Sequence, residues 1–434
     1  MDIKNIFLKN NINKNITVKG WIKNFRNNKF IIINDGTYYK NIQIVFNKNK
    51  YNKLILKYLT IGTSLKVKGV LLYRYNILEI KLKNILIYHN NLKKNIQKSL
   101  LQKKNHSITF IRKQRFLRFQ TNIYTNILRI KNYVKYIIYK YLYKKNFIYI
   151  QTPIITNINP ESILEVFILK NNFFKNEKYL TVSGQLENEI SINGIKKVFS
   201  FGPVFRAEKS ITNKHLAEFW MLEIEIAFCN LKKLIIFIKK FLKYLITKII
   251  LKCKNDLSVI DKFNKKDKNY SFNKILNILN NIKIITYKKI IKILKKKYNT
   301  INYGINITNK YEKYLSEYFN NNTILIIKNY PKNIKAFYMK LNENNKTVKS
   351  IDILFPYIGE IIGGSERENN FDILLKNIKK HRISKKLMSN YLKTRIYGNT
   401  PHSGFGFGFD RFIQFITNIN NIKDIVDFPI YYKK

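Results

Sequence analysis

The residue types best suited to phosphate chemistry gather in one segment, Phe199–Phe228, which reads FSFGPVFRAEKSITNKHLAEFWMLEIEIAF. Arg206 and Glu208 are two positions apart, so on a strand their side chains share one face. An arginine suits bidentate contact with a phosphate or a carboxylate. Further polar, aromatic and acidic candidates follow at His215, Phe219, Glu223 and Glu225. Taken alone, Arg206 and Glu208 are better explained as a surface ion pair on a hairpin, so the segment gains meaning only together with others.

A second segment, SIDILFPYIGEIIGGSER at Ser350–Arg367, combines carboxylates with glycines. Asp352 and Glu360 flank a predicted turn, and such hard carboxylates suit Mg²⁺ that is shared with phosphates. The pair Gly363-Gly364 allows the backbone to approach a ligand closely. The alternative is a plain hairpin with a glycine bulge.

A third segment, PHSGFGFGFDR at Pro401–Arg411, alternates glycine with aromatic residues before a predicted amphipathic helix. It lacks the GxGxxG spacing and the βαβ setting of a dinucleotide fold, so a Rossmann site is disfavoured. The alternation instead favours a strand whose glycine face forms the floor for a flat ligand. Arg411 falls at the start of the helix, where anions are also favoured.

The elements that must position these segments are predicted to be helices and mainly antiparallel strands. Residues 121–144 carry apolar side chains at helical spacing, and in the β-rich run 147–155 Pro153 favours an edge or interface strand. Residues 179–228 read as strand, turn, strand, loop and strand. Further strands are predicted at 324–328, 336–341 and 348–354, while residues 230–300 read as helical and low in complexity. Without βαβ alternation, the fold class is α+β.

The pattern of β-rich runs in residues 1–90 predicts a small β-barrel of the OB type. The β-rich runs lie at 16–25, 29–34, 41–46, 64–72 and 77–87, and Asp35-Gly36 is a hairpin signal after the second of them. The predicted organisation is therefore a barrel at 1–90, a basic linker at 91–120 and a larger domain at 121–434. Within that domain, residues 230–300 resemble an insertion.

The composition is basic, with a formal net charge of +55 at pH 7. Such a charge attracts polyanions, but Lys, Asn, Ile, Tyr and Phe also accumulate by drift in A/T-rich genomes, so the charge alone does not establish RNA binding. The two cysteines, Cys229 and Cys253, form no CxxC pair, which argues against a disulfide framework or a Cys-rich zinc site. The N-terminus has no signal-peptide stretch, and lysines interrupt the apolar run 231–253, so no membrane attachment is expected.

Together and in this order, the three segments resemble the class II aminoacyl-tRNA synthetases. Arg206-Ala-Glu208 with His215-x-x-x-Phe219 resembles motif 2 of that family, and GFGFGFDR resembles motif 3. The helix and strand at 121–155 resemble motif 1, which forms the dimer interface. An OB barrel ahead of this core is the arrangement of the aspartyl, asparaginyl and lysyl subgroup. The residues closest to asparaginyl members lie at 180–189, 201–223, 330–341, 358–368 and 397–411, and the resemblance lapses only at 230–300.

The resemblance implies a catalytic domain built on an antiparallel sheet flanked by helices, with ATP and Mg²⁺ bound on it. Arg206 is implied to bridge the ATP α-phosphate and the amino-acid carboxylate, where it stabilises developing charge. Glu208 is implied to contact the adenine amino group, and Phe219 to stack on the ring. The other implied ATP-binding residues are His215 and Arg411 on the outer phosphates, Asp352 and Glu360 on Mg²⁺, and Gly408. The residues implied to act in catalysis are Arg206, Glu208 and Arg411.

The same resemblance implies sites for the amino acid and for tRNA. The residues implied to bind the amino acid are Glu161, Ser183, Gln185, Glu223 and Arg367, with the carboxylates near its ammonium group and Arg367 near its side chain. In the barrel, Arg26, Phe30 and Gln43 match positions that meet the anticodon, where aromatic stacking contributes roughly 1–3 kcal/mol per base. A homodimer through the motif 1 region is also implied.

The identity of the amino acid depends on one position. In aspartyl members a lysine lies three positions after the glutamine that matches Gln185, whereas here Asn188 stands between Glu187 and Glu189. A buried carboxylate without a second cation is costly, so the residues favour asparagine, and with it tRNA(Asn). An aspartyl or non-discriminating enzyme is the close alternative. A non-catalytic RNA-binding relative is disfavoured because the ATP residues are present, and an asparagine synthetase because the barrel precedes the core.

The chain departs from the family pattern in three places. Ser162-Ile163-Leu164 replaces a small, glycine-containing segment after Glu161, Glu366 stands where a neutral residue is usual, and Ile430 replaces an arginine. These departures predict altered loop mobility and efficiency, not another function. The composition favours the cytoplasm of a bacterium with an A/T-rich genome, with an organelle as the alternative.

Overall fold

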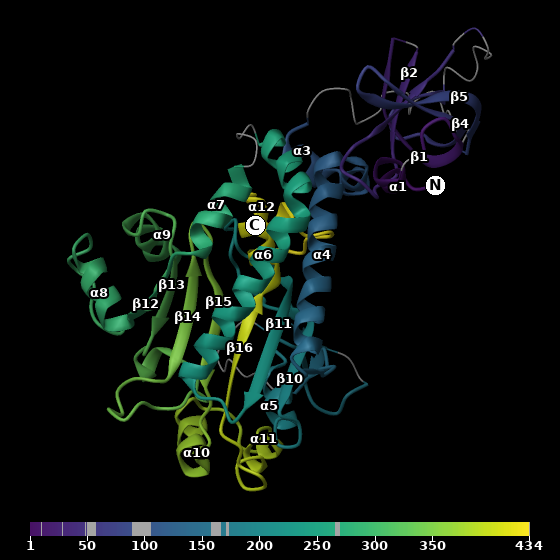
Figure 1. Ribbon diagram of the computed structural model, residues 1–434. Helices are drawn as coiled ribbons and strands as arrows, with labels where there is room; N and C mark the ends of the chain where they lie inside the picture. Colours follow the sequence, from purple (N-terminus) through teal and green to yellow (C-terminus); the bar gives the residue numbers. More distant parts are fainter. Residues whose placement is uncertain are drawn as a thin grey trace. The chain divides into compact units, whose positions relative to one another are not determined.

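The computed structural model describes residues 1–9, 11–27, 29–47, 49, 58–88, 106–157, 166–170, 173–264 and 270–433. The chain divides into two compact units, Met1–Arg129 and Ile130–Lys434 (Figure 1). The domain boundaries at residues 90 and 120 stay predictions. Of the predicted linker, residues 91–105 lie outside the described residues, and the rest forms α3 (Ile108–Lys113) and the 3-10 helix η3 (Arg115–Gln120).

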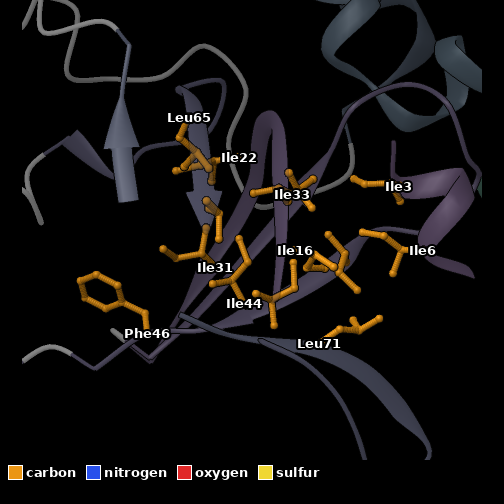
Figure 2. Packing of buried hydrophobic residues seen from close by; sticks show 14 of the residues in the cluster. Ile3, Ile6, Ile16, Ile22, Ile31, Ile33, Ile44, Phe46, Leu65 and Leu71 are labelled. Carbon is orange, nitrogen blue, oxygen red and sulfur yellow. The ribbon is translucent and has the colours of Figure 1, made fainter. Parts of the chain in front are cut away.

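Five strands of the first unit close into a barrel in the order β1-β2-β3-β5-β4, which confirms the predicted OB fold. The strands are β1 (Asn15–Arg26), β2 (Phe30–Asn34), β3 (Ile42–Val45), β4 (Ser64–Arg74) and β5 (Ile77–Ile87). Alternate residues of these strands point inward, and their aliphatic side chains meet in one buried cluster (Figure 2). Burying each such side chain contributes roughly 1.5–3 kcal/mol. The short helix α1 (Ile3–Leu8), which was not predicted, adds Ile3 and Ile6 to this core.

An eight-stranded sheet forms the centre of the second unit, in the order β12-β13-β14-β15-β16-β11-β10-β6 (Figure 1). Its strands are β6 (Ile148–Tyr149), β10 (Lys197–Phe205), β11 (Glu218–Ala227), β12 (Ile282–Thr286), β13 (Ile324–Lys328), β14 (Ser350–Phe355), β15 (Gly359–Glu366) and β16 (His402–Gly408). The strands pair antiparallel except at the two edges, where β12 pairs with β13 and β6 with β10 in parallel. The predicted antiparallel sheet is thus confirmed, with a parallel pair at each edge.

The two faces of this sheet differ because side chains alternate along each strand. On β16, Phe405 and Phe407 turn toward the long helix α6 (Leu231–Phe263), whose Phe241 ring lies 6.3 and 5.8 Å from theirs. The glycines between them leave the other face open. Within residues 230–300, whose insertion-like character stays a prediction, α6 covers the apolar face of the sheet.

The remaining elements show where local patterns misled the prediction. The run at 147–155 is not one strand, because β6 ends before Pro153 and β7 (Ile155–Thr156) begins after it. No strand forms at 336–341, which makes only isolated bridges from Met339 and Leu341. A helix, α5 (Gln185–Ser191), replaces the predicted turn within 179–228, and β12 interrupts the helical stretch at 230–300.

Helices and short strands complete the described chain. They are α4 (Asn122–Lys144), α7 (Tyr270–Leu279), α8 (Tyr287–Lys295), α9 (Asn309–Tyr318), α10 (Phe371–Lys380), α11 (Ser389–Lys393), α12 (Phe409–Thr417), β8 (Ile168–Leu169), β9 (Lys178–Leu180), η4 (Lys332–Ile334) and η5 (Ile422–Asp424). The predicted helix at 121–144 is confirmed as α4, whose Tyr139 packs against Phe199 and Phe201 of β10. Among the described helices, none combines the length and apolar composition needed to cross a membrane.

Candidate active site

One row of residues crosses the open face of the sheet in register. It runs from Ser200 on β10 through Glu223 on β11, Gly406 on β16 and Gly363 on β15 to Asp352 on β14. Neighbouring strands lie about 4.8 Å apart, so the Glu223 and Asp352 backbones are separated by three spacings, roughly 14 Å. The row therefore places one carboxylate at each end of a glycine floor.

A cavity of about 330 Å³ opens over this row. Its lining includes every residue of the second unit that was predicted to bind ATP, Mg²⁺ or the amino acid and that the structure describes: Ser183, Gln185, Arg206, Glu208, His215, Phe219, Glu223, Asp352, Glu360, Arg367, Gly408 and Arg411. Glu161, and with it the departure Ser162-Ile163-Leu164, lies outside the described residues. Residues that are up to 228 positions apart in the chain thus line one cavity.

Arg206 and Glu208 enter the cavity from a loop, not from the strand on which they were predicted, because β10 ends at Phe205. The Arg206 N–H still donates to the Ala217 carbonyl oxygen at 2.9 Å, so strand-like pairing extends one residue further. The Arg206 guanidinium carbon lies 5.4 Å from the centre of the Phe219 ring. A cation and an aromatic face therefore stand side by side, as a nucleotide site requires.

His215 stands on the same loop and faces the Glu208 carboxylate, with 3.7 Å between Nε2 and Oε2. Its other ring nitrogen lies 3.0 Å from the Ser210 hydroxyl oxygen. Burial, with the nearby charge of Arg411, lowers the pKa of His215. The neutral imidazole is therefore favoured as long as no anion enters the cavity.

Asp352 and Glu360 converge above Gly363 at one end of the row. A Cβ added to Gly363 would lie 2.9 Å from Glu360 Oε1 and 3.9 Å from Asp352 Oδ1, so only a glycine leaves the space between the two carboxylates open. Burial and the neighbouring Asp352 raise the pKa of Glu360 to about 7. Lys335, which was not predicted, donates to both Asp352 oxygens at 2.8 and 2.6 Å.

This pair of carboxylates fits a divalent cation that is held jointly with phosphates. Mg²⁺ typically takes one or two protein carboxylates and completes its shell with water and phosphate oxygens. Within the described parts of the chain, no group of three or more His, Cys, Asp or Glu side chains is placed to hold a metal. A cation between Asp352 and Glu360 would therefore depend on the nucleotide. Arg411 borders this end and donates to the Glu360 carbonyl oxygen at 2.9 Å.

Glu223 lies at the opposite end of the row, where it is held in place on several sides. The Ser183 hydroxyl donates to one carboxylate oxygen, and the Gly184 N–H donates to the other at 2.8 Å. Ser200 lies 3.4 Å away, and its hydroxyl accepts from the Asn188 amide at 2.8 Å. Asn188 is thus buried behind Glu223, at the position where aspartyl members were expected to carry a lysine.

Glu225 and Arg367 form a buried pair next to Glu223. The Arg367 guanidinium donates to Glu225 Oε1 through Nη2 at 2.5 Å and through Nε at 3.1 Å. Burial raises the pKa of Glu225 to about 7, against the opposing effect of Arg367. The sequence offered Glu225 as an acidic candidate two positions after Glu223, but no role was assigned to it. The signal that could have identified Glu225 is its position two residues after Glu223, because residues two apart on a strand share one face.

The three residues predicted to meet the anticodon share one outer face of the barrel. Arg26 pairs with Phe30 across β1 and β2, and Gln43 pairs with Ile32 one row further along. The Gln43 amide donates to Glu79 at 3.2 Å. This face thus offers an arginine, an aromatic ring and an amide, which are groups that stack on bases or hydrogen-bond to them.

One of the departures from the family pattern has a structural explanation. Glu366 points away from the cavity, lies 3.4 Å from Lys340 and 3.5 Å from Lys349, and accepts from the Leu231 N–H at 3.2 Å, at the start of α6. There a negative charge is favourable. Ile430 accepts from the Ala217 N–H at 2.9 Å through its backbone carbonyl oxygen, a contact that any residue could make, so nothing in the structure explains why it replaces an arginine.

Comparison with known proteins agrees with this geometry. Residues 107–431 match the family described as tRNA synthetases class II (D, K and N), and residues 16–88 match the OB-fold nucleic acid binding domain. The chain is 39% identical to the asparagine–tRNA ligase of Borreliella afzelii, over 98% of this chain and 97% of that protein. It is 38% identical to the asparagine–tRNA ligase of Buchnera aphidicola, over 96% and 95%.

A solved structure is similar over the same extent. The asparaginyl-tRNA synthetase of Pyrococcus horikoshii, complexed with asparaginyl-adenylate, superimposes with a TM-score of 0.86 at 28% sequence identity. The match covers 97% of this chain and 96% of that one. The likeness therefore includes both the barrel and the sheet that carries the cavity.

Proposed function

Because the chain belongs to the asparagine–tRNA ligases, within the class II tRNA synthetases, we propose that it attaches asparagine to tRNA(Asn) at the expense of ATP. The observation that carries this proposal is the cavity itself. At one end of the cavity lie the carboxylates Asp352 and Glu360 with the basic residue Arg411, and at the other end lies the Glu225–Arg367 pair. The glycine floor between them has room for a flat adenylate.

In the first step the asparagine carboxylate attacks the α-phosphorus of ATP. A carboxylate oxygen–phosphorus bond forms, the bond to the bridging oxygen breaks, and pyrophosphate leaves. Arg206 contacts both the α-phosphate and the attacking carboxylate and stabilises the charge that develops between them. Glu208 and Phe219 hold the adenine, so positioning and charge stabilisation account for the catalysis without a covalent enzyme intermediate.

The outer phosphates lie toward Asp352 and Glu360. Asp352 and Glu360 would hold Mg²⁺ there, and the ion would neutralise phosphate charge and so support the departure of pyrophosphate. Lys335 donates to Asp352 and adds a positive charge to this end of the cavity. His215 and Arg411 complete the basic side of the site. Phosphate binding favours a proton on the His215 imidazole, whose pKa is otherwise lowered by burial and by Arg411.

The amide side chain of asparagine matches the Glu225–Arg367 pair. An amide offers an N–H donor and a carbonyl acceptor side by side, while Glu225 accepts and Arg367 donates. An aspartate side chain would instead place a second carboxylate against Glu225, which is unfavourable in a buried site. Glu223 and Ser183 stand where the substrate ammonium group binds, with Gln185 at the rim.

In the second step a hydroxyl of the terminal tRNA ribose attacks the activated carbonyl carbon. The ester bond forms, the bond to the phosphate oxygen breaks, and AMP leaves. The barrel face that carries Arg26, Phe30 and Gln43 binds the anticodon and so selects tRNA(Asn). Base stacking on Phe30 is worth roughly 1–3 kcal/mol.

We further propose a homodimer through the motif 1 region, residues 121–155. Five large apolar side chains stand about half exposed there: Tyr136 at 56%, Tyr143 at 55%, Ile148 at 51%, Ile155 at 46% and Ile154 at 45%. Several large apolar side chains left exposed within one short region are typical of a protein interface. A second copy of the chain would cover them.

ATP–pyrophosphate exchange with each amino acid tests the proposed reaction. Asparagine should support exchange, and aspartate should do so much less. Exchange with aspartate at an equal or greater rate would establish the aspartyl alternative instead. Absence of exchange with every amino acid, by a folded protein that binds tRNA, would establish a non-catalytic relative.

A further inference from the structure

Glu189 is a buried carboxylate that lies behind the amino-acid end of the cavity and does not line it. It is on α5, and its side chain is completely enclosed. A carboxylate in such a place needs several donors, because an unpaired buried charge is strongly unfavourable. Glu189 itself and three of the residues around it, Tyr391, Arg395 and His402, have no role in the proposed reaction.

The partners of Glu189 come from four separate parts of the chain. Glu189 Oε2 accepts from Arg395 Nη2 at 2.7 Å, from the Tyr391 hydroxyl at 2.7 Å and lies 3.0 Å from His402 Nε2. Glu189 Oε1 accepts from the Gln185 amide at 2.7 Å and lies 3.8 Å from Arg367 Nε. Two of these partners, Gln185 and Arg367, line the cavity themselves.

The charges around Arg367 are nearly balanced by this arrangement. Arg367 and Arg395 carry two positive charges, and Glu225 and Glu189 supply two carboxylates. Both arginines stay charged at any accessible pH. Whatever charge His402 carries, the site would be more positive by one unit without Glu189. In a buried region that difference acts over several ångströms with little screening.

We propose that Glu189 is a specificity-determining positioning residue, whose buried charge makes the amino-acid site bind a neutral amide side chain in preference to a carboxylate. The inference rests on the proposed function, since it concerns how asparagine is distinguished from aspartate. Glu189 acts through Arg367 and Gln185, which it orients from behind. Its negative charge offsets the arginines, so the carboxylate of aspartate gains no compensating attraction from them.

Replacing Glu189 with glutamine tests the charge separately from the shape. Glu189→Gln keeps the size of the side chain but leaves one cation in excess, which attracts the aspartate side chain. We expect the kcat/KM ratio of aspartate to asparagine in ATP–pyrophosphate exchange to rise about tenfold or more. Non-reacting sulfamoyl analogues of the two adenylates, measured by calorimetry, should shift in the same direction. An unchanged ratio in both measurements overturns the proposal.

The double variant Glu189→Gln/Arg395→Met removes one charge of each sign. The balance is restored, so the ratio should return to within about threefold of the parent, given that coupled sites deviate from additivity. A double variant that keeps the raised ratio would show that charge balance is not the cause, and would overturn the proposal. Tyr391→Phe is the matched control, because it removes a hydrogen bond to Glu189 without a charge and should leave the ratio unchanged.

Glu189→Gln leaves a buried arginine without its main partner, so this variant is the one most at risk of failing to fold. In that event Arg395→Met provides the test, because it makes the site more negative. The aspartyl analogue should then bind more weakly relative to the asparaginyl analogue, and an unchanged preference contradicts the inference. If the parent enzyme does not use asparagine at all, the proposed function fails; if the parent discriminates and the variants do not shift, only the inference fails.

Discussion

Replacing Gly363 with alanine would put a methyl group between the two carboxylates of the proposed metal site. Its Cβ would lie 2.9 Å from Glu360 Oε1 and 3.9 Å from Asp352 Oδ1. Non-bonded heavy atoms are most favourable at about 3.5–4.0 Å, so the Glu360 carboxylate must move by roughly 0.6 Å. The Asp352 side is unaffected at that distance, so the strain falls on one ligand.

Two opposing effects of this substitution can be compared. Alanine is favoured over glycine inside a strand by roughly 0.5–1 kcal/mol, so the fold should not suffer. A catalytic constellation tolerates about 0.5 Å of displacement, and a shift of about 1 Å can cost 10²-fold in rate. We therefore expect Gly363→Ala to lower ATP–pyrophosphate exchange by roughly 10- to 100-fold, with unchanged or slightly raised thermal stability.

The assay is ATP–pyrophosphate exchange over a range of Mg²⁺ concentrations, alongside a melting curve. The KM for ATP should rise and more Mg²⁺ should be needed, while the KM for asparagine stays close to that of the parent. Gly202→Ala is the matched control on β10 of the same sheet, because an added Cβ there meets no atom within 4 Å. If Gly363→Ala exchanged pyrophosphate at the parent rate with the parent Mg²⁺ dependence, the placement of the metal between these carboxylates would have to be given up.

Three further predictions concern the two ends of the cavity, the barrel and the interface. Arg206→Lys keeps the charge but loses the planar fork, so it should slow adenylate formation by roughly 100-fold or more. Gln43→Ala should leave pyrophosphate exchange unchanged and weaken tRNA charging. If Arg206→Lys exchanged pyrophosphate at the parent rate, the proposed role of Arg206 would be contradicted. Burial raises the pKa of Glu225 to about 7, so its carboxyl is protonated below that pH and ceases to accept from the substrate amide. The KM for asparagine should therefore rise as the pH falls below about 7 and stay flat above it, and a KM that is constant from pH 6 to 8 speaks against this role. Light scattering at micromolar concentration should give a dimer, and Tyr143→Glu should dissociate it; a fully active monomeric parent is the outcome that contradicts the interface.

Much of the fold could be predicted because its signals are local. The five barrel strands follow alternating β-rich runs, and α4 follows apolar residues at helical spacing, so both lie close to their predicted bounds. The errors arose where context outweighed the local pattern. α5 forms in a stretch that read as a turn, and the β-rich residues 336–341 form no strand.

The sequence by itself supplied the candidate site residues, because Arg206, Glu223 and Asp352 stand in short segments that resemble motifs of the family, and their roles in the reaction stay predictions. Only the tertiary structure decided what surrounds them. Lys335 meets Asp352 across a turn, Arg367 meets Glu225 from 142 positions away, and Arg395 meets Glu189 from 206 positions away. No local pattern encodes these pairs, because strand register and helix packing bring them together. Their energies depend on burial, which a residue acquires only when the whole sheet is assembled.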